Sequence, residues 1–288
     1  MNRRLIATAA SAAYGPSLLA LLGSLTLNWP EHPPVQVYDI GLDERTRTAL
    51  DEAGAAVKAV PSFCPHWRKH YTWKFWCVND APAAEVLWLD AGAIALRPLD
   101  EVFDAIAAQG YFFVPTYHSL TESASTGACR GCGVPPDFRT GKMAIAAGVA
   151  GYRKDGLVGR IVQEALEIAL TEEHIAATHP LHRHDQAILS LLAYRELRAP
   201  LLFDGLVYSG WRGPSQAPGQ AIWVHRRGMR PEDQAHFAAH VSRSGEMYMP
   251  SAPADPPVPS VGTRLLRSAG RLRQRSTPKP AIPDGLRD

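Results

Sequence analysis

The stretch that decides the fold runs from Val86 to Asp100 and reads VLWLDAGAIALRPLD. It begins with four apolar residues, a pattern typical of a strand that is covered on both faces of a sheet. Asp90 follows directly, and in open parallel sheets ligands bind beyond the carboxyl ends of the strands. Pro98 and Asp100 then suit the first turn of a helix. The stretch predicts a buried strand that delivers one carboxylate, either to a ligand site or to an ordinary loop cap.

The first sixty residues predict alternating strands and helices. Strands are expected over residues 5–10, 35–40 and 56–60, where apolar residues run together or alternate. One helix is expected over 17–27, and a second begins near Asp43, a good N-cap, and stops at Gly54. This order is typical of an α/β protein with a doubly wound, mostly parallel sheet, which is the fold class we predict.

Composition and charge separate the body of the chain from its last part. The 288 residues are 46% hydrophobic and 20% charged, enough for one large α/β domain, which we expect over residues 1–249. Residues 250–288 are rich in proline and arginine, so a disordered tail is expected there. The body is nearly neutral, which argues against a nucleic-acid partner. Residues 263–275 favour either peripheral contact with anionic lipid at the inner membrane face or a solubilising tail.

The cysteines and the N-terminal residues give information about the cellular compartment. The four cysteines are too few and too irregularly spaced for a disulfide framework, so a reduced cytoplasmic setting is expected. Cys129 and Cys132 have metal or redox spacing, but no second pair completes a structural zinc site, and plain thiols are the favoured interpretation. The uncharged run from Leu5 to Pro30 could serve as a targeting segment, although Gly15 and Pro16 break it into a strand and a helix.

The stretch around Asp90 resembles the DxD region of nucleotide-sugar glycosyltransferases with the A-type fold, especially glycogenin-like and polysaccharide-biosynthesis enzymes. In that family the strand ends in Leu-Asp-x-Asp and continues into Leu-x-Pro-Leu. Gly92 stands here in place of the second Asp, which is the family's main metal ligand. The resemblance implies the nucleotide-diphospho-sugar transferase fold and a hexosyltransferase activity. It also implies a divalent metal, manganese or magnesium, and a donor such as a UDP-sugar.

Two further motifs flank this stretch. Lys74 lies in a Thr-x-Lys that resembles the family's motif, whose lysine approaches the donor's phosphates or sugar, while core packing with the amine in solvent is the alternative. Gly148 and Val149 resemble the family's Asn-x-Gly-Val strand, with Ala146 in place of the sugar-binding Asn. That replacement is a second departure from the family pattern.

Two motifs late in the chain complete the resemblance, which covers about residues 4–228. Asp185 and Gln186 resemble the family's Asp-Gln, whose Asp faces the transferred sugar, although a plain helix cap is the alternative. Asp185 would orient a sugar hydroxyl or, in an inverting reaction, accept the acceptor's proton. His225 ends a strand that resembles the closing strand of the family, whose His binds metal and pyrophosphate. Arg226 and Arg227 beside it suit a phosphate clamp that needs no metal.

The resemblance thus implies a set of site residues. The implied catalytic residues are Asp185 and Gln186. The implied donor-binding residues are Thr8, Ala9, Tyr14, Lys74, Asp90, Ala91, Gly92, His225 and Arg226, with Ala10 and Asp39 nearby, and the implied metal ligands are Asp90 and His225.

Several alternatives remain open at the level of function. The leading hypothesis is transfer of a sugar to a hydroxyl of a saccharide or lipid-linked saccharide acceptor, in polysaccharide or glycoconjugate synthesis. A non-catalytic sugar-nucleotide-binding or regulatory protein on the same scaffold is the second, and a metal or membrane module built on the Cys-x-x-Cys segment and the tail is the third. Residues 116–141 predict a long loop that either covers the donor or receives the acceptor, with His118, Arg130 and Arg139 as polar contacts. Residues 200–203 predict a late strand.

Overall fold

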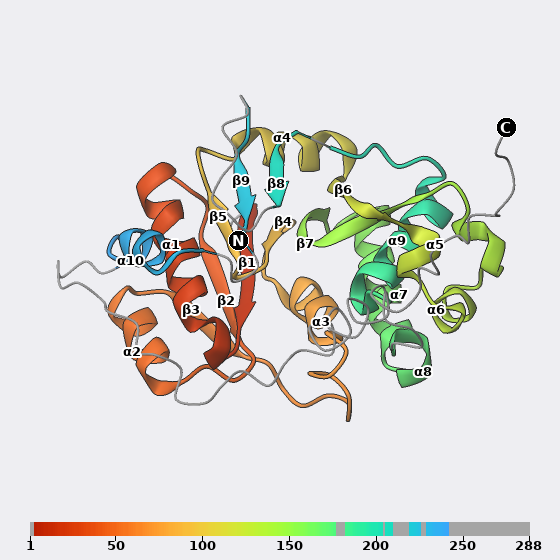
Figure 1. Ribbon diagram of the computed structural model, residues 1–288, viewed down its shortest axis with the longest axis horizontal. Helices are drawn as coiled ribbons and strands as arrows, with labels where there is room; N and C mark the ends of the chain where they lie inside the picture. Colours follow the sequence, from red (N-terminus) through yellow and green to blue (C-terminus); the bar gives the residue numbers. More distant parts are fainter. Residues whose placement is uncertain (1–2, 177–181, 204, 210–218, 226–228, 242–288) are drawn as a thin grey trace, which may run out of the picture. The chain divides into compact units, whose positions relative to one another are not determined.

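The computed structural model describes residues 3–176, 182–203, 205–209, 219–225 and 229–241, and its centre is a six-stranded sheet (Figure 1). The strands lie in the order β3-β2-β1-β4-β7-β6, and β7 runs antiparallel to both of its neighbours while the other five are parallel to one another. This confirms the predicted mostly parallel α/β fold. The strands are β1 (Arg4–Ala10), β2 (Val35–Asp39), β3 (Ala56–Ala59), β4 (Glu85–Leu89), β6 (Tyr111–Ser119) and β7 (Met143–Arg153).

Strand β4 shows how the sheet is covered on both faces. Val86 and Trp88 pack in the core that contains α3, α7 and α9, whereas Leu87 and Leu89 pack in the core that contains α1 and α4. The apolar run therefore belongs to a strand that is buried on both sides, as its sequence predicts. The helices named here are α1 (Gly15–Asn28), α3 (Trp73–Asp80), α4 (Asp100–Gln109), α7 (Leu157–Ala169) and α9 (His184–Leu197).

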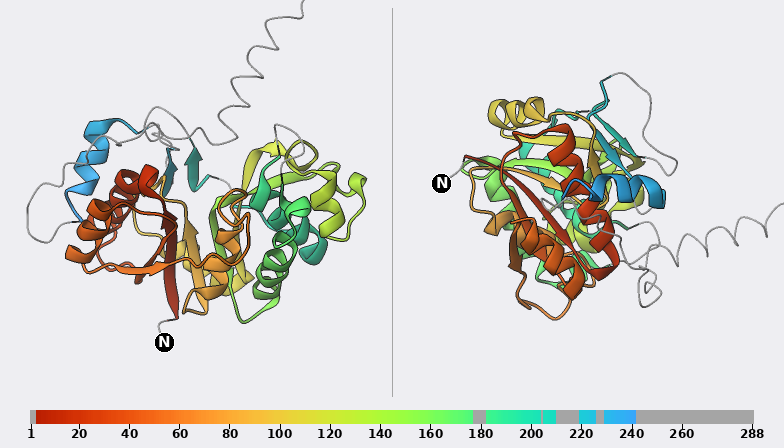
Figure 2. Two further views of the ribbon diagram at one scale, coloured as in Figure 1. Left: turned by 90° about the horizontal axis from the view of Figure 1, so that it is seen from below. Right: turned by 90° about the vertical axis from the view of Figure 1, so that its left-hand side faces the viewer.

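Two more helices pack on α1. Asp43 caps α2 (Glu44–Glu52) by accepting a hydrogen bond from the backbone of Thr46, as predicted for this N-cap. Helix α10 (Pro231–Ala238) lies beside α1, as both views in Figure 2 show. A Cβ at Gly23 would come within 1.7 Å of the Phe237 carbonyl oxygen, so α1 and α10 approach as closely as they do because residue 23 is glycine.

A small second sheet connects residues 207–224 to the segment after β4. Its order is β5-β9-β8, from β5 (Ala93–Ala95), β9 (Ile222–Val224) and β8 (Val207–Ser209). Strand β9 is antiparallel to β5, and the backbone N–H of His225 donates to the Gly92 carbonyl oxygen at 2.9 Å. The closing strand therefore brings His225 next to the loop that follows Asp90.

Two sequence-based predictions about local structure are wrong. Residues 116–141 are not a long loop: β6 continues to Ser119 and is followed by α5 (Leu120–Ser123), α6 (Thr126–Gly131) and a 3-10 helix (Pro136–Arg139). Ser119 and Ser125 cap the two α-helices, which are too short to show periodicity in the sequence. Residues 200–203 form no strand; Phe203 makes one backbone hydrogen bond to Phe113, and the late strand is β8 instead.

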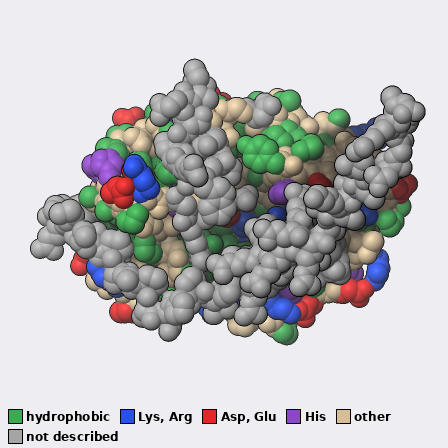
Figure 3. Space-filling model, in the orientation of Figure 1, with side chains coloured by type: hydrophobic (Ala, Val, Ile, Leu, Met, Phe, Trp, Pro, Cys, Tyr) green, Lys and Arg blue, Asp and Glu red, His purple; other side chains and the backbone are tan. Residues whose placement is uncertain are grey.

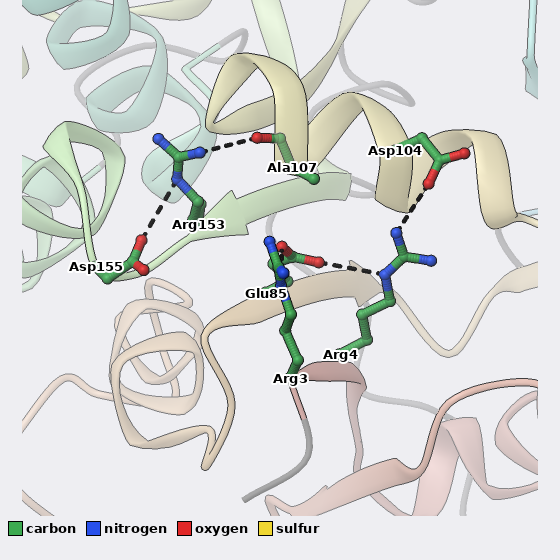
Figure 4. Close-up of polar contacts among 7 residues, drawn as sticks. All are labelled: Arg3, Arg4, Glu85, Asp104, Ala107, Arg153 and Asp155. Carbon is green, nitrogen blue, oxygen red and sulfur yellow. Dashed lines mark hydrogen bonds and ion pairs between the residues drawn. The ribbon is translucent and has the colours of Figure 1, made fainter.

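The end of β4 opposite to Asp90 is closed by ion pairs (Figure 4). Glu85 is buried at the start of the strand and accepts hydrogen bonds from Arg3 at 2.8 Å and Arg4 at 3.3 Å. Arg4 also reaches Asp104 of α4 at 2.8 Å. These contacts join β1, β4 and α4 at the amino ends of the parallel strands.

The cysteines and the tail bear on the remaining structural predictions. Cys129 and Cys132 are free and buried, and burial raises the pKa of both thiols, that of Cys132 to about 12. Such thiols stay protonated at neutral pH and are poor nucleophiles. No helix in the described ranges is both long enough and apolar enough to cross a bilayer. The predicted tail lies beyond residue 241, outside the described residues.

Candidate active site

Lys74 is the centre of the site. Its Nζ lies 2.9 Å from Asp90 Oδ1 and 3.1 Å from Asp185 Oδ2, and it donates a hydrogen bond to the Ala147 carbonyl oxygen at 3.1 Å. The side chain is nearly inaccessible to solvent. Burial alone would lower the pKa of Lys74, but the attraction of Asp185 and Asp90 outweighs it and raises the pKa above its usual value. Lys74 is therefore a permanent buried cation between two carboxylates.

Asp90 faces both the buried lysine and solvent. Trp88 Nε1 donates to Asp90 Oδ1 at 2.8 Å, and the Asp90 backbone N–H donates to the Gly148 carbonyl oxygen at 2.8 Å. A Cβ at position 148 would lie 2.7 Å from Asp90 Oδ2, so glycine there leaves room for the carboxylate. The Asp90 side chain keeps 41% of its surface exposed, and a ligand can therefore reach this carboxylate from solvent.

Asp185 approaches Lys74 from the first turn of α9. Its side chain is only 9% exposed, and burial raises the pKa of this carboxyl despite the opposing effect of Lys74. Its contact with Lys74 makes it more than the plain helix cap that the sequence left open. Gln186, the next residue, has a buried Nε2 without a hydrogen-bond partner among the described residues. Asp185 and Asp90 thus share Lys74 as their common cation.

His225 is fully buried at the end of β9. Neither ring nitrogen has a hydrogen-bond partner within the described ranges, although the ring packs near Trp223. Burial lowers the pKa of His225 to about 4, so the imidazole is neutral at physiological pH. A neutral imidazole with unsatisfied nitrogens can coordinate a metal or hydrogen-bond a phosphate.

The residues present fit a divalent metal only in part. Asp90 and His225 supply one carboxylate and one neutral imidazole, and the unpartnered nitrogens of His225 suit a metal ligand. Gly92, at the third position of the motif, supplies none. The part of the chain that the structure describes contains no group of three His, Cys, Asp or Glu side chains arranged around one metal position. A hard cation would need water and donor phosphates to complete its oxygen shell.

The other residues implied by the resemblance line the same end of the sheet. Thr8 and Ala9 are buried in β1, which pairs with β4, and Thr8 Oγ1 has no partner in the described part of the chain. Tyr14 closes the 3-10 turn after β1, and Ala91 and Gly92 are buried in the loop after β4. Arg226 and Arg227 lie outside the described residues.

Three expected polar contacts are occupied elsewhere in the fold. Asp39 accepts hydrogen bonds from the backbone of Gly41 and Leu42 and pairs with Arg47, which together hold the turn after β2. Arg130 pairs with Glu173. Arg139 donates to the Ala124 and Pro136 carbonyl oxygens.

Sequence reasoning missed two features beside the site. Tyr71 and His184 both have left-handed backbones, with φ of 61° and 36°, and their rings lie 5.7 Å apart between centroids. Tyr71 is an exposed aromatic three residues before Lys74, and His184 directly precedes Asp185. No residue pattern signals these features, because left-handed backbone at a residue other than glycine arises from tertiary contacts.

Comparisons with known proteins agree with this geometry at the level of the fold. No protein-family model matches the chain, and no curated protein matches it. Among solved structures, the galactosyltransferase LgtC in complex with donor and acceptor sugar analogues superposes with a TM-score of 0.51 at 15% identity, over 82% of this chain and 95% of that chain. The bifunctional glycosyltransferase WbbM, without ligand, gives 0.56 at 12% identity, over 82% of this chain and 50% of WbbM. The chain therefore has the A-type fold of nucleotide-sugar glycosyltransferases.

Proposed function

We propose that this chain is a glycosyltransferase that moves a hexose from a nucleotide diphosphate donor to a hydroxyl of a saccharide or lipid-linked acceptor. The observation that supports this most is Lys74, a buried cation held between Asp90 and Asp185 beyond the carboxyl end of β4. Buried polar groups are normally hydrogen-bonded. Unpartnered polar atoms of Thr8, Gln186 and His225 occur on the segments around this cation, as expected if a polar ligand completes the site.

The proposed roles follow from charge and burial. Lys74 stabilises the negative charge that develops on the departing diphosphate, because a compact ammonium in a water-poor site interacts strongly with phosphate. His225 donates a ring N–H to a phosphate oxygen or holds a metal together with Asp90. A divalent ion at that place would supply further positive charge to the leaving group. Asp185, already paired with Lys74, orients a hydroxyl of the transferred sugar.

Mixed surface charge favours a small-molecule donor over nucleic acid. Acidic and basic side chains are interspersed over the described part of the face in Figure 3. A nucleic-acid partner requires a basic stripe or patch.

A non-catalytic donor-binding protein is the second candidate. Gly92 and Ala146 replace the Asp and Asn that the family pattern has at these positions, and these two replacements favour this alternative. Both candidates predict that a nucleotide diphosphate-sugar binds. Only the transferase predicts release of a nucleotide diphosphate, so incubation with a bound donor and measurement of the freed diphosphate separates them.

Calorimetric binding of UDP, GDP and their common sugar conjugates tests the proposal. We expect nucleotides of one base to bind. A comparison of binding in manganese and in a chelator then shows whether a divalent metal takes part. The variant Lys74→Met should lose binding. Lys58→Met is the matched control, because Lys58 is a half-exposed lysine that pairs with Asp80 at 2.6 Å on the edge strand β3. Failure of the unaltered protein to bind any of these nucleotides would contradict the proposed function.

A further inference from the structure

The strained pair Tyr71 and His184 carries an inference about the sugar itself, which rests on the proposed function. Among the described residues, the non-glycine positions with left-handed backbone are Tyr71, His184 and Arg198. Residues with a Cβ disfavour this conformation, and such strain persists where the surrounding structure enforces it, often at ligand-binding positions. Two of these three residues, Tyr71 and His184, contact each other beside the ion pairs that Lys74 makes.

Both strained residues are tied to the site by the backbone. The Tyr71 carbonyl oxygen accepts a hydrogen bond from the Lys74 backbone N–H at 3.0 Å. His184 precedes Asp185, whose carboxylate lies 3.1 Å from Lys74 Nζ. Burial raises the pKa of the Tyr71 phenol; Tyr14, Asp185 and Asp90 act in the same direction, and Lys74 opposes them. The phenol therefore lies within electrostatic reach of the groups proposed to hold the donor.

His184 gives Tyr71 a rigid backing. Its ring is fixed by a contact of Nδ1 with the Ile175 carbonyl oxygen at 2.9 Å. It also lies 5.0 Å from the ring of His70 and 5.2 Å from that of His182, between centroids. Tyr71 packs in addition on Trp73, at 6.2 Å. Yet Tyr71 keeps 38% of its surface exposed, so its ring is supported by the fold and still accessible to a ligand.

The backbone conformation at position 71 disfavours a tyrosine. Glycine would adopt a φ of 61° without strain and would leave the Lys74 backbone hydrogen bond intact. We propose that Tyr71, held against His184, is the platform on which a pyranose ring packs beside Asp185. An aromatic ring offers a flat apolar surface to the C–H groups of a sugar, and the neighbouring polar groups fix the orientation of its hydroxyls. Tyr71 is thus a specificity-determining residue for the sugar.

The variant Tyr71→Gly tests this platform, because it removes the ring and relieves the strain together. Relief of strain offsets part of the lost packing, so the variant should remain folded by circular dichroism. For the nucleotide that binds the unaltered protein, we expect the affinity of the sugar conjugate to fall about tenfold while that of the bare diphosphate changes less than about twofold. Tyr71→Phe, which keeps the ring, should retain the affinity for the conjugate.

Arg198→Gly is the matched control. Arg198 has a φ of 62° and is exposed just after α9, so this variant also replaces a side chain at a positive φ without touching the site. It should bind the conjugate like the unaltered protein. Equal affinity of Tyr71→Gly for the conjugate would exclude the donor's sugar as the group on the platform.

A second arm separates the donor's sugar from an acceptor sugar, since both are pyranoses. Methyl glycosides of glucose, galactose and mannose are added to the protein saturated with bare diphosphate, and saturation-transfer NMR reports their contact. If Tyr71 carries the acceptor, this signal falls in Tyr71→Gly while conjugate affinity is unchanged. The inference is overturned when neither readout changes. Because the unaltered protein must bind a nucleotide in both arms, that result leaves the proposed function standing.

Discussion

The two ends of β4 hold the same chemical pair in opposite arrangements. At the amino end, the Glu85 side chain is 1% exposed and its partner Arg3 is 74% exposed, so the carboxylate is buried and the cation faces solvent (Figure 4). At the carboxyl end, Lys74 is 7% exposed and Asp90 is 41% exposed, so the cation is buried and the carboxylate faces solvent. An exposed guanidinium that covers a buried carboxylate closes a structure. A buried ammonium beneath an open carboxylate leaves a charged site accessible to a ligand.

The polar atoms near the two ends of β4 also differ in whether they have hydrogen-bond partners. Arg3 and Arg4 donate to both oxygens of Glu85, and Arg4 continues to Asp104. At the carboxyl end, by contrast, Gln186 next to Asp185 and His225 next to Gly92 keep buried nitrogens without partners in the described part of the chain. We infer that the first cluster stabilises the sheet and that the second is built for a ligand. Four predictions test this difference, from the largest expected effect to the smallest.

Removal of Lys74 should disrupt the carboxyl end most severely. Lys74→Met leaves Asp185 buried without a counter-ion, which costs about 3–5 kcal/mol of unfolding free energy. Denaturant unfolding measures this loss, and calorimetry should show no nucleotide binding. The double variant Lys74→Met with Asp185→Asn should recover part of the stability and none of the binding. Full nucleotide affinity in either variant would show that the buried cation is not part of the site.

His225 should make stability depend on acid pH. Its pKa is lowered by burial to about 4 in the folded state, against about 6.5 in the unfolded chain. The unfolded state therefore binds the proton first, and the contribution is fully present above about pH 6.5 and is lost as the pH falls toward 4. The expected loss is about 3 kcal/mol. His225→Asn should lose less stability than the unaltered protein between pH 7 and 4.5, and parallel curves would contradict the assignment.

A change at the amino end of β4 should lower the stability of the protein and leave nucleotide binding unchanged. Glu85→Gln removes the charge that Arg3 and Arg4 share, and we expect a loss of about 2 kcal/mol of unfolding free energy. Nucleotide affinity should stay within about twofold, because the change lies at the opposite end of the strand. A large loss of affinity in a folded Glu85→Gln protein would remove the distinction between the two ends.

An acidic residue at position 92 should strengthen metal binding at the carboxyl end of β4. Gly92→Asp adds a carboxylate next to the His225 backbone and should raise the affinity for manganese about tenfold, measured by the paramagnetic resonance of the free ion. Gly92 has no left-handed φ that would require glycine. Gly92→Asn, of the same size and without charge, is the control. Equal manganese affinity in both variants would show that Asp90 and His225 do not form a metal position.

Local patterns predicted most of the framework because they depend on neighbours in the sequence. The apolar run before Asp90 and the cap at Asp43 each lie within one element, and the structure has those elements there. Predictions failed where an element was too short for a period, as in α5 and α6, or lacked a ladder partner, as at Phe203. In both places a few hydrogen bonds decide the structure, and the residue pattern does not show them.

The sequence by itself determined the fold class and indicated the kinds of residue at the candidate site. The order of strands and helices, the lone carboxylate after β4 and the lysine before it could all be read from the chain, because burial and propensity act over a few residues. The tertiary structure decided which of these residues meet: Lys74 joins Asp90 and Asp185 across long stretches of chain, and Asp39 is held by its own turn instead. It also decided the left-handed backbone of Tyr71 and His184, because only packing from several elements can hold a residue in a backbone conformation that it disfavours.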